Sequence, residues 1–245
     1  MRRRTTTALV LLALVATAGC GFSSGGNNSG GTHITVFAAS SLTDAFTAIG
    51  RAYKSAHHGA TVTFSFAGSP DLVAQVQQGA PANVIATAST KSMDDVAKEL
   101  VEPAQPFARN QLVIVTEKGN PKHIASLADL ARGGTIAVLA TQGVPAGDYA
   151  RQALSDAHVT VHPKSLEPNV RGVLTKVELG EADAGIVYVT DALVAGDKVA
   201  TVPIDNAPIA TYPIGAITAA GQPFVQFVLS TEGQAILHRF GFLPP

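Results

Sequence analysis

Two serines follow a short apolar β-type run near the start of the chain. Residues 34–38 read as a strand, Ser40 and Ser41 come directly after it, and a helical pattern begins at Leu42. The first N–H groups of a helix have no intrahelical partner, and the helix dipole is positive at that end. Together with two hydroxyls they form a donor set suited to an anion. Taken alone, the segment is more simply an ordinary turn with a serine cap.

The same arrangement recurs along the chain, and this recurrence favours a binding site. Each further segment places small or polar residues where a predicted strand ends or a predicted helix begins. Hydroxyl donors come from serine and tyrosine, and backbone N–H donors from helix starts. The candidate donors are the hydroxyls of the serines and the tyrosine and the backbone N–H groups at the helix starts: Ser40, Ser41, Ser69, Ala146, Val170 and Tyr188.

These segments are rich in neutral donors and poor in cations, since only Arg171 lies among them. Such a set suits a fully deprotonated oxyanion, because an ionised acceptor strengthens each hydrogen bond about twofold. A protonated anion would also need an acceptor for its proton. Asp44, Asp71 and Asp148 are nearby in sequence, but we interpret them as partners of helix dipoles in first turns, not as ligands.

The elements that must position these residues alternate between strand and helix patterns. Residues 61–66 and 111–116 are typical strands, and 42–55 and 70–78 are typical helices. A helix is also expected over 91–100 and a weak strand at 159–162. This alternation predicts an α/β protein with mostly parallel sheets flanked by helices. In such sheets ligands lie at the carboxyl ends of the strands, so the segments just after the strands are the ones expected to carry a site.

The first 31 residues read as an export signal and a tether. Three arginines precede a short apolar segment, and small residues then lead to Cys20, the single cysteine. This order predicts a signal peptide over 1–19 and resembles a bacterial lipobox, although Thr17 stands where leucine is usual. Residues 20–31 then predict a lipidated cysteine with a Gly/Ser-rich flexible tether.

Composition excludes several classes of function. The 17 basic and 18 acidic side chains give a net charge of −1, and no basic patch predicts binding to nucleic acid. One cysteine permits no intramolecular disulfide, and the seven histidines show no metal-binding spacing. We therefore expect no cofactor and no direct metal ligands.

Five segments, in order, carry a resemblance to the molybdate-binding proteins of bacterial ABC importers. They extend from residue 34 to 242 and read ITVFAASSLTDAF, FAGSPDLVAQVQQGAPANV, VPAGDYARQAL, NVRGVLTKVELGEADAGIVYVTDA and RFGF.

The resemblance implies a two-lobed type II periplasmic-binding fold with the ligand in the cleft. Lobe I would comprise 32–110 plus 213–245 and lobe II 111–212, with crossings near Asn110 and Thr211. The oxyanion, molybdate or tungstate, would be held by Ser41 and Ser69 from one lobe and by Ala146, Val170 and Tyr188 from the other. The role of Ser40, at a position where many relatives have a non-hydroxyl residue, stays open.

The resemblance also implies the setting of this function. The protein would be a monomer at the outer face of the cell membrane, held by the lipid at Cys20, and would deliver its ligand to a membrane permease.

Two alternatives stay open at this point. A serine hydrolase would need an activated nucleophile, yet residues 67–71 (AGSPD) lack the second glycine of a nucleophile elbow. The same fold with another solute would favour a cationic cluster, which is not evident.

Overall fold

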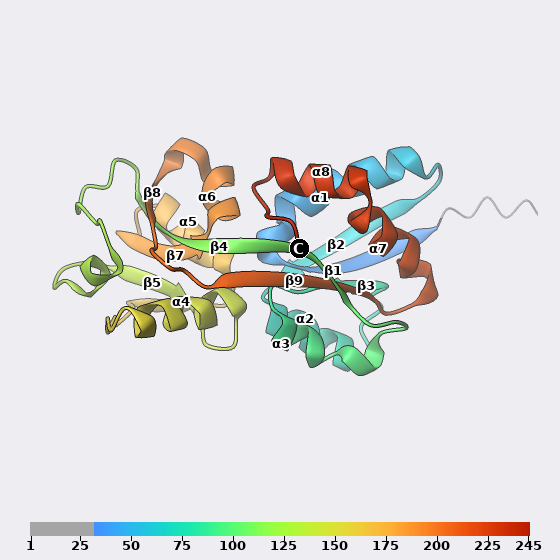
Figure 1. Ribbon diagram of the computed structural model, residues 1–245, viewed down its shortest axis with the longest axis horizontal. Helices are drawn as coiled ribbons and strands as arrows, with labels where there is room; N and C mark the ends of the chain where they lie inside the picture. Colours follow the sequence, from blue (N-terminus) through green and yellow to red (C-terminus); the bar gives the residue numbers. More distant parts are fainter. Residues whose placement is uncertain (1–31) are drawn as a thin grey trace, which may run out of the picture. The chain divides into compact units, whose positions relative to one another are not determined.

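The computed structural model describes residues 32–245, so the predicted signal peptide (1–19), Cys20 and the tether (20–31) lie outside the described residues. Within the described part, eight strands form a path in the order β2-β1-β3-β9-β4-β7-β5-β6, and a ninth, β8, pairs with β4. Figure 1 shows two groups of strands and helices joined by β4 and β9.

The first group is built on β1 (His33–Ala39), a mostly apolar strand that is buried along most of its length. It pairs in parallel with β2 (Thr61–Ala67) and β3 (Val84–Ala86), and β3 pairs antiparallel with β9 (Ile209–Ala216). Parallel neighbours bring the carboxyl ends of β1 and β2 to one edge, where Ala39 is level with Ala67. The serine segments that follow both strands therefore begin side by side.

The second group repeats this plan. Here β5 (Ala137–Ala140) pairs in parallel with β6 (Ser165–Glu167) and β7 (Ala184–Tyr188). The strand β8 (Val199–Pro203) lies beside β4. Four of the five residues of β7 are apolar and all are buried, as expected for a strand covered on both faces.

The long strand β4 (Gln105–Glu117) joins the groups. Its first half pairs with β9, and its second half pairs with β7 and β8. The predicted crossings at Asn110 and Thr211 both fall inside paired strands, where Arg109 is level with Thr211. The bounds of the two lobes, 32–110 plus 213–245 and 111–212, stay a prediction.

Helices cover both groups (Figure 1). In the first group, α1 and α8 lie over one face of the sheet and α2 and α3 over the other, with α7 packed on α8. In the second group, α4 lies on one face and α5 and α6 on the other. The helix bounds are α1 (Thr43–Ala56), α2 (Ser69–Gln77), α3 (Thr90–Asp94), α4 (Pro145–Asp156), α5 (Val170–Glu178), α6 (Val189–Ala195), α7 (Gln222–Leu229) and α8 (Thr231–Arg239).

Local sequence explains where the helices that matter here begin. Proline opens the first turns of α2 and α4, where its fixed φ suits a helix and its missing N–H has no cost. Asn169 caps α5, and its side chain accepts the Gly172 N–H at 3.0 Å. Each start is therefore defined by residues within one turn of it.

An aromatic core fixes the first group. The Phe46 ring of α1 lies 5.6 Å from Phe107 and 6.2 Å from Phe224, and all three side chains are fully buried. Aromatic pairs at such separations add stabilisation beyond the area they bury. Because Phe46 lies five residues after Ser41, this packing also positions the serine segment.

Two expectations about secondary structure were wrong, and one helix was not expected. Residues 159–162 form no strand, because the Val159 N–H caps the end of α4 by donating to the Leu154 carbonyl, and the strand lies at Ser165–Glu167 instead. The helix expected over 91–100 is interrupted after Asp94. The helix α6 was not predicted, because it follows the strand β7 directly and its N-cap residue is Tyr188, not Ser, Thr, Asp or Asn.

None of the helices in residues 32–245 is long and apolar enough to cross a membrane.

Candidate functional site

A small cavity lies between the two groups, at the ends of β1, β2 and β7. Residues from both groups line it, and all five predicted ligands are among them. No charged side chain is in this lining, within the part of the chain that the structure describes. The lining consists of Ala39, Ser40, Ser41, Ala67, Gly68, Ser69, Ala88, Val144, Pro145, Ala146, Val170 and Tyr188.

Ser41 lies in a short 3₁₀ turn, Ser40–Leu42, between β1 and α1. Its hydroxyl is buried and lies 2.9 Å from the hydroxyl of Tyr212 on β9. If Tyr212 donates in this bond, the Ser41 proton is free to point into the cavity. Ser40 lines the same cavity and is buried, and its carbonyl accepts a bond from the Thr43 hydroxyl.

Ser69 is the first residue of α2 and is 1 % exposed. Its Oγ accepts the backbone N–H of Ala88 at 3.1 Å, which orients the hydroxyl and leaves its proton available. Its own N–H lies in the first turn of the helix and has no carbonyl one turn earlier to bond. Ser69 can therefore donate twice into the cavity.

Ala146 and Val170 contribute backbone groups from the other side. They lie in the first turns of α4 and α5, so both N–H groups are free of intrahelical bonds. With α2, three helices of eight or more residues start at one cavity, and their dipoles favour negative charge there. An anion would thus be stabilised without a cationic side chain in contact with it.

Tyr188 ends β7 and is 1 % exposed. Its hydroxyl has no hydrogen-bond partner among the described residues. Burial raises the pKa of Tyr188 well above its usual value, and the neighbouring Tyr212 adds to the rise. The phenol is therefore a neutral donor, and an unpaired buried donor is costly unless a ligand satisfies it.

An ion-pair chain runs beside the cavity. Arg171 donates through Nε to Asp191 and through Nη2 to Asp44, both at 2.7 Å. Burial alone would lower the pKa of Arg171, but Asp191 and Asp44 outweigh it and raise that pKa. Burial raises the pKa of Asp191 to about 6, against the opposing charge of Arg171. Arg171 thus meets a carboxylate on each side, so its charge is compensated, and its side chain is not part of the cavity lining.

The first-turn aspartates lie as predicted, in α1, α2 and α4. Asp148 accepts the Gly143 N–H and so also shapes the turn before α4. Neither the contact of Tyr212 with Ser41 nor the pairing of Arg171 with Asp44 was predicted, because these contacts join residues 171 and 127 positions apart.

The partners of the two serine hydroxyls bear on the alternative of a serine hydrolase. A serine nucleophile needs a base within hydrogen-bond reach. In the described residues the Ser41 hydroxyl is bonded to a tyrosine and the Ser69 hydroxyl to a backbone N–H, and neither is bonded to histidine or carboxylate. No cluster of three or more His, Cys, Asp or Glu side chains that could hold a metal ion occurs in residues 32–245.

Comparison with known proteins agrees with this geometry. Residues 34–243 match the family described as bacterial extracellular solute-binding protein. The molybdate-binding protein ModA of Mycobacterium tuberculosis is 41% identical over 252 residues, covering 97% of this chain and 95% of that protein.

Two solved structures share the fold at low sequence identity. The periplasmic molybdate-binding protein of Azotobacter vinelandii has a TM-score of 0.71 at 18% identity, covering 86% of this chain and 99% of that one. The sulfate-binding protein SubI of M. tuberculosis has a TM-score of 0.74 at 21% identity, covering 87% of each chain. The predicted fold class, that of the periplasmic binding proteins, is thus confirmed.

Proposed function

Since the chain belongs to the family of bacterial extracellular solute-binding proteins and, within it, to the molybdate-binding proteins, we propose that it captures molybdate for an ABC importer. The ligand is held by Ser41, Ser69, Ala146, Val170 and Tyr188 through neutral hydrogen-bond donors. Molybdenum is bound as its oxyanion, without direct metal ligands and without a cofactor.

One observation carries the proposal. The Tyr188 hydroxyl is buried and unpaired, and it belongs to a cavity whose lining has donors but no charged side chain. A fully deprotonated oxyanion satisfies every one of these donors. A protonated anion or a carboxylic acid would need a hydrogen-bond acceptor for its proton. The lining has no carboxylate to serve as that acceptor.

Selectivity follows from the rigidity of the donors. Ser41 and Ser69 are each held by a neighbour, Tyr212 and the Ala88 N–H, so they cannot follow a smaller anion inward. We therefore expect the site to reject sulfate, which is smaller than molybdate. Tungstate matches molybdate in size and charge and is proposed as a second ligand.

The rest of the proposal concerns the setting. The protein binds its ligand without transforming it, acts outside the cytoplasm as a monomer, and passes the anion to a membrane permease that recognises the ligand-bound arrangement of the two groups. A lipid on Cys20, with the tether at 20–31, keeps it at the outer face of the membrane.

A thermal-shift screen of tetrahedral oxyanions tests the proposal. Ligand that binds only the folded state raises the melting temperature, and at a thousandfold excess over Kd the gain is about 4 kcal/mol. Molybdate and tungstate should shift the transition, and sulfate and phosphate should not. A shift with sulfate alone would replace molybdate with sulfate as the ligand.

Removal of either serine hydroxyl should weaken binding. A hydrogen bond to a charged group contributes about 1.5–3 kcal/mol, so Ser41→Ala and Ser69→Ala should each lower molybdate affinity roughly ten- to hundredfold in calorimetry. Ser89→Ala, which removes a buried serine hydroxyl outside the cavity lining, is the control. Affinity equal to the wild type in both variants would contradict the assignment.

A further inference from the structure

The ion-pair chain Asp44–Arg171–Asp191 joins the two groups beside the cavity. Asp44 lies in the first turn of α1, in the first group, whereas Arg171 and Asp191 lie on α5 and α6 of the second group. The bond from Arg171 to Asp44 therefore crosses between the groups, and the bond from Arg171 to Asp191 stays within one of them.

Each member lies next to a proposed ligand. Arg171 follows Val170 directly, and Asp44 comes three residues after Ser41. Asp191 comes three residues after Tyr188 and accepts the Tyr188 backbone N–H at 3.2 Å. The ion-pair chain thus connects three segments of the site through residues that flank the proposed ligands: the serine turn, the start of α5 and the end of β7.

We propose that this chain of three charges is a clasp that holds the serine turn against α5 and β7 around the bound oxyanion. Arg171 is then a positioning residue and not a ligand. The inference rests on the proposed binding of an oxyanion in this cavity, and it adds residues that touch no ligand.

The burial of the three groups indicates which bond opens. Asp191 is 0% exposed, so its bond to Arg171 is shielded from water and keeps the guanidinium aimed at the first group. Asp44 is 36% exposed and is the partner that water can replace when the groups separate. A contact made only when the groups are together favours that state by its differential free energy. The clasp should accordingly slow release of the anion more than it speeds capture.

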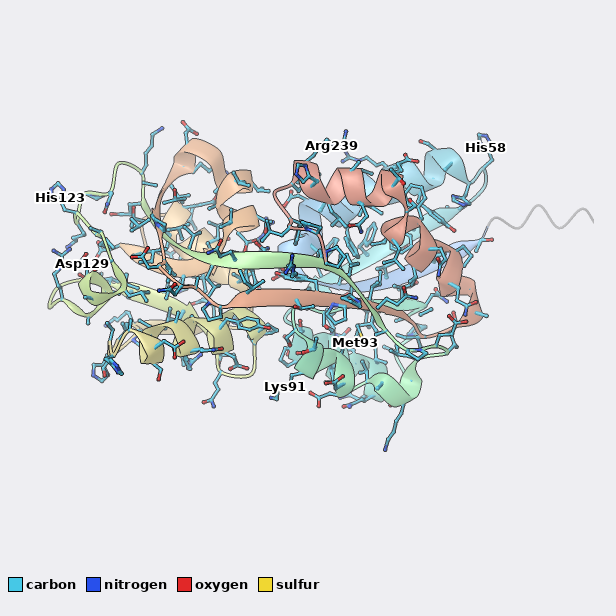
Figure 2. The ribbon with its side chains drawn as sticks, in the orientation of Figure 1. His58, Lys91, Met93, His123, Asp129 and Arg239 are labelled. Atoms are coloured by element: carbon cyan, nitrogen blue, oxygen red, sulfur yellow. The ribbon has the colours of Figure 1, made fainter. Side chains whose placement is uncertain are left out.

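Asp44→Asn tests the clasp most directly. It removes the charge of Asp44, the more exposed partner, and leaves the buried Arg171–Asp191 pair intact. Arg171→Met would leave the buried Asp191 carboxylate without its ion-pair partner, and this variant risks misfolding. Asp44→Glu keeps the negative charge and tests whether the charge alone restores the slow release of the anion. Arg132→Met is the matched control, since Arg132 pairs with Asp129 inside the second group, at its outer end (Figure 2).

Rapid-mixing kinetics on the full chain, with molybdate, tungstate, sulfate and phosphate as probes, separates the outcomes. In Asp44→Asn the release rate should rise about tenfold with the capture rate nearly unchanged, as expected when one partner of a partly buried charge pair is lost. Asp44→Glu should restore slow release, and Arg132→Met should match the wild type.

Unchanged release in Asp44→Asn would overturn the clasp while the wild type still bound molybdate, so the proposed function would stand. Faster release of a different oxyanion, with no molybdate binding by the wild type, would support the clasp and contradict molybdate as the ligand. Failure of the wild type to bind any of the four anions would overturn both.

Discussion

Replacing Tyr188 by phenylalanine is expected to lower molybdate affinity about a hundredfold, equal to about 3 kcal/mol and at the upper end for a hydrogen bond to an ion. The upper end applies because the hydroxyl is fully buried, and no water can replace it as a donor to the anion. Since that hydroxyl has no partner among the described residues, its removal breaks no internal bond. The melting temperature of the ligand-free protein should therefore stay the same or rise.

Tyr53→Phe is the control for this variant. Tyr53 is also buried, but its ring packs on Phe224 in the first group, 5.4 Å away, and it is not part of the cavity lining. Calorimetry should show wild-type affinity for Tyr53→Phe. If Tyr188→Phe instead lowered the ligand-free melting temperature and left the affinity intact, the Tyr188 hydroxyl would be structural.

Gly68→Ala is expected to weaken binding by a similar or larger factor, for a steric reason. A Cβ at Gly68 would lie 2.5 Å from the backbone carbonyl oxygen of Pro168, which belongs to the second group. Backbone cannot move aside as a side chain can, so the segments before α2 and α5 would have to separate. Overpacking of this kind costs about 3 kcal/mol, or roughly a hundredfold in affinity.

Gly133→Ala provides the matched control, because a Cβ there has no atom within 4 Å. Affinity should be measured by calorimetry, and compactness by small-angle scattering with and without molybdate. Gly68→Ala should bind weakly and should not become as compact as the wild type with ligand. Wild-type affinity in Gly68→Ala would show that close contact between Gly68 and Pro168 is not needed for binding.

The sequence predicted residues that line one cavity, because each of them belongs to a local feature. Each ligand candidate lies at a strand end or in a helix first turn, and such ends are marked by proline, serine or asparagine within a few residues. Parallel pairing then brings these ends to one edge, as the register of Ala39 with Ala67 shows. The resemblance to molybdate-binding proteins supplied the choice of five residues from a larger set.

The partners of those residues could not be predicted in the same way. Tyr212 supports Ser41, yet the two residues lie 171 positions apart in the chain. For Arg171 the sequence indicates a residue that orients a loop or pairs with an acid, but it does not identify Asp44 or Asp191 as the partner. Such contacts depend on how the strands and helices of the two groups are placed, which periodicity does not encode.

The same limit explains the errors in secondary structure. Residues 159–162 alternate between apolar and polar positions as a strand would, but no strand is placed to pair with them. Short elements such as β6 and α6, of three and seven residues, are defined by their neighbours more than by their own pattern. The long elements around the site, by contrast, were predicted to within a few residues at most ends.

Isothermal titration calorimetry of the full chain with molybdate, and in parallel with sulfate, tests the central claim most directly. A cavity of rigid neutral donors sized for the larger oxyanion predicts one tight site for molybdate per chain and no measurable heat from sulfate under the same conditions. Sulfate binding as tightly as molybdate, or the absence of molybdate binding, would contradict it.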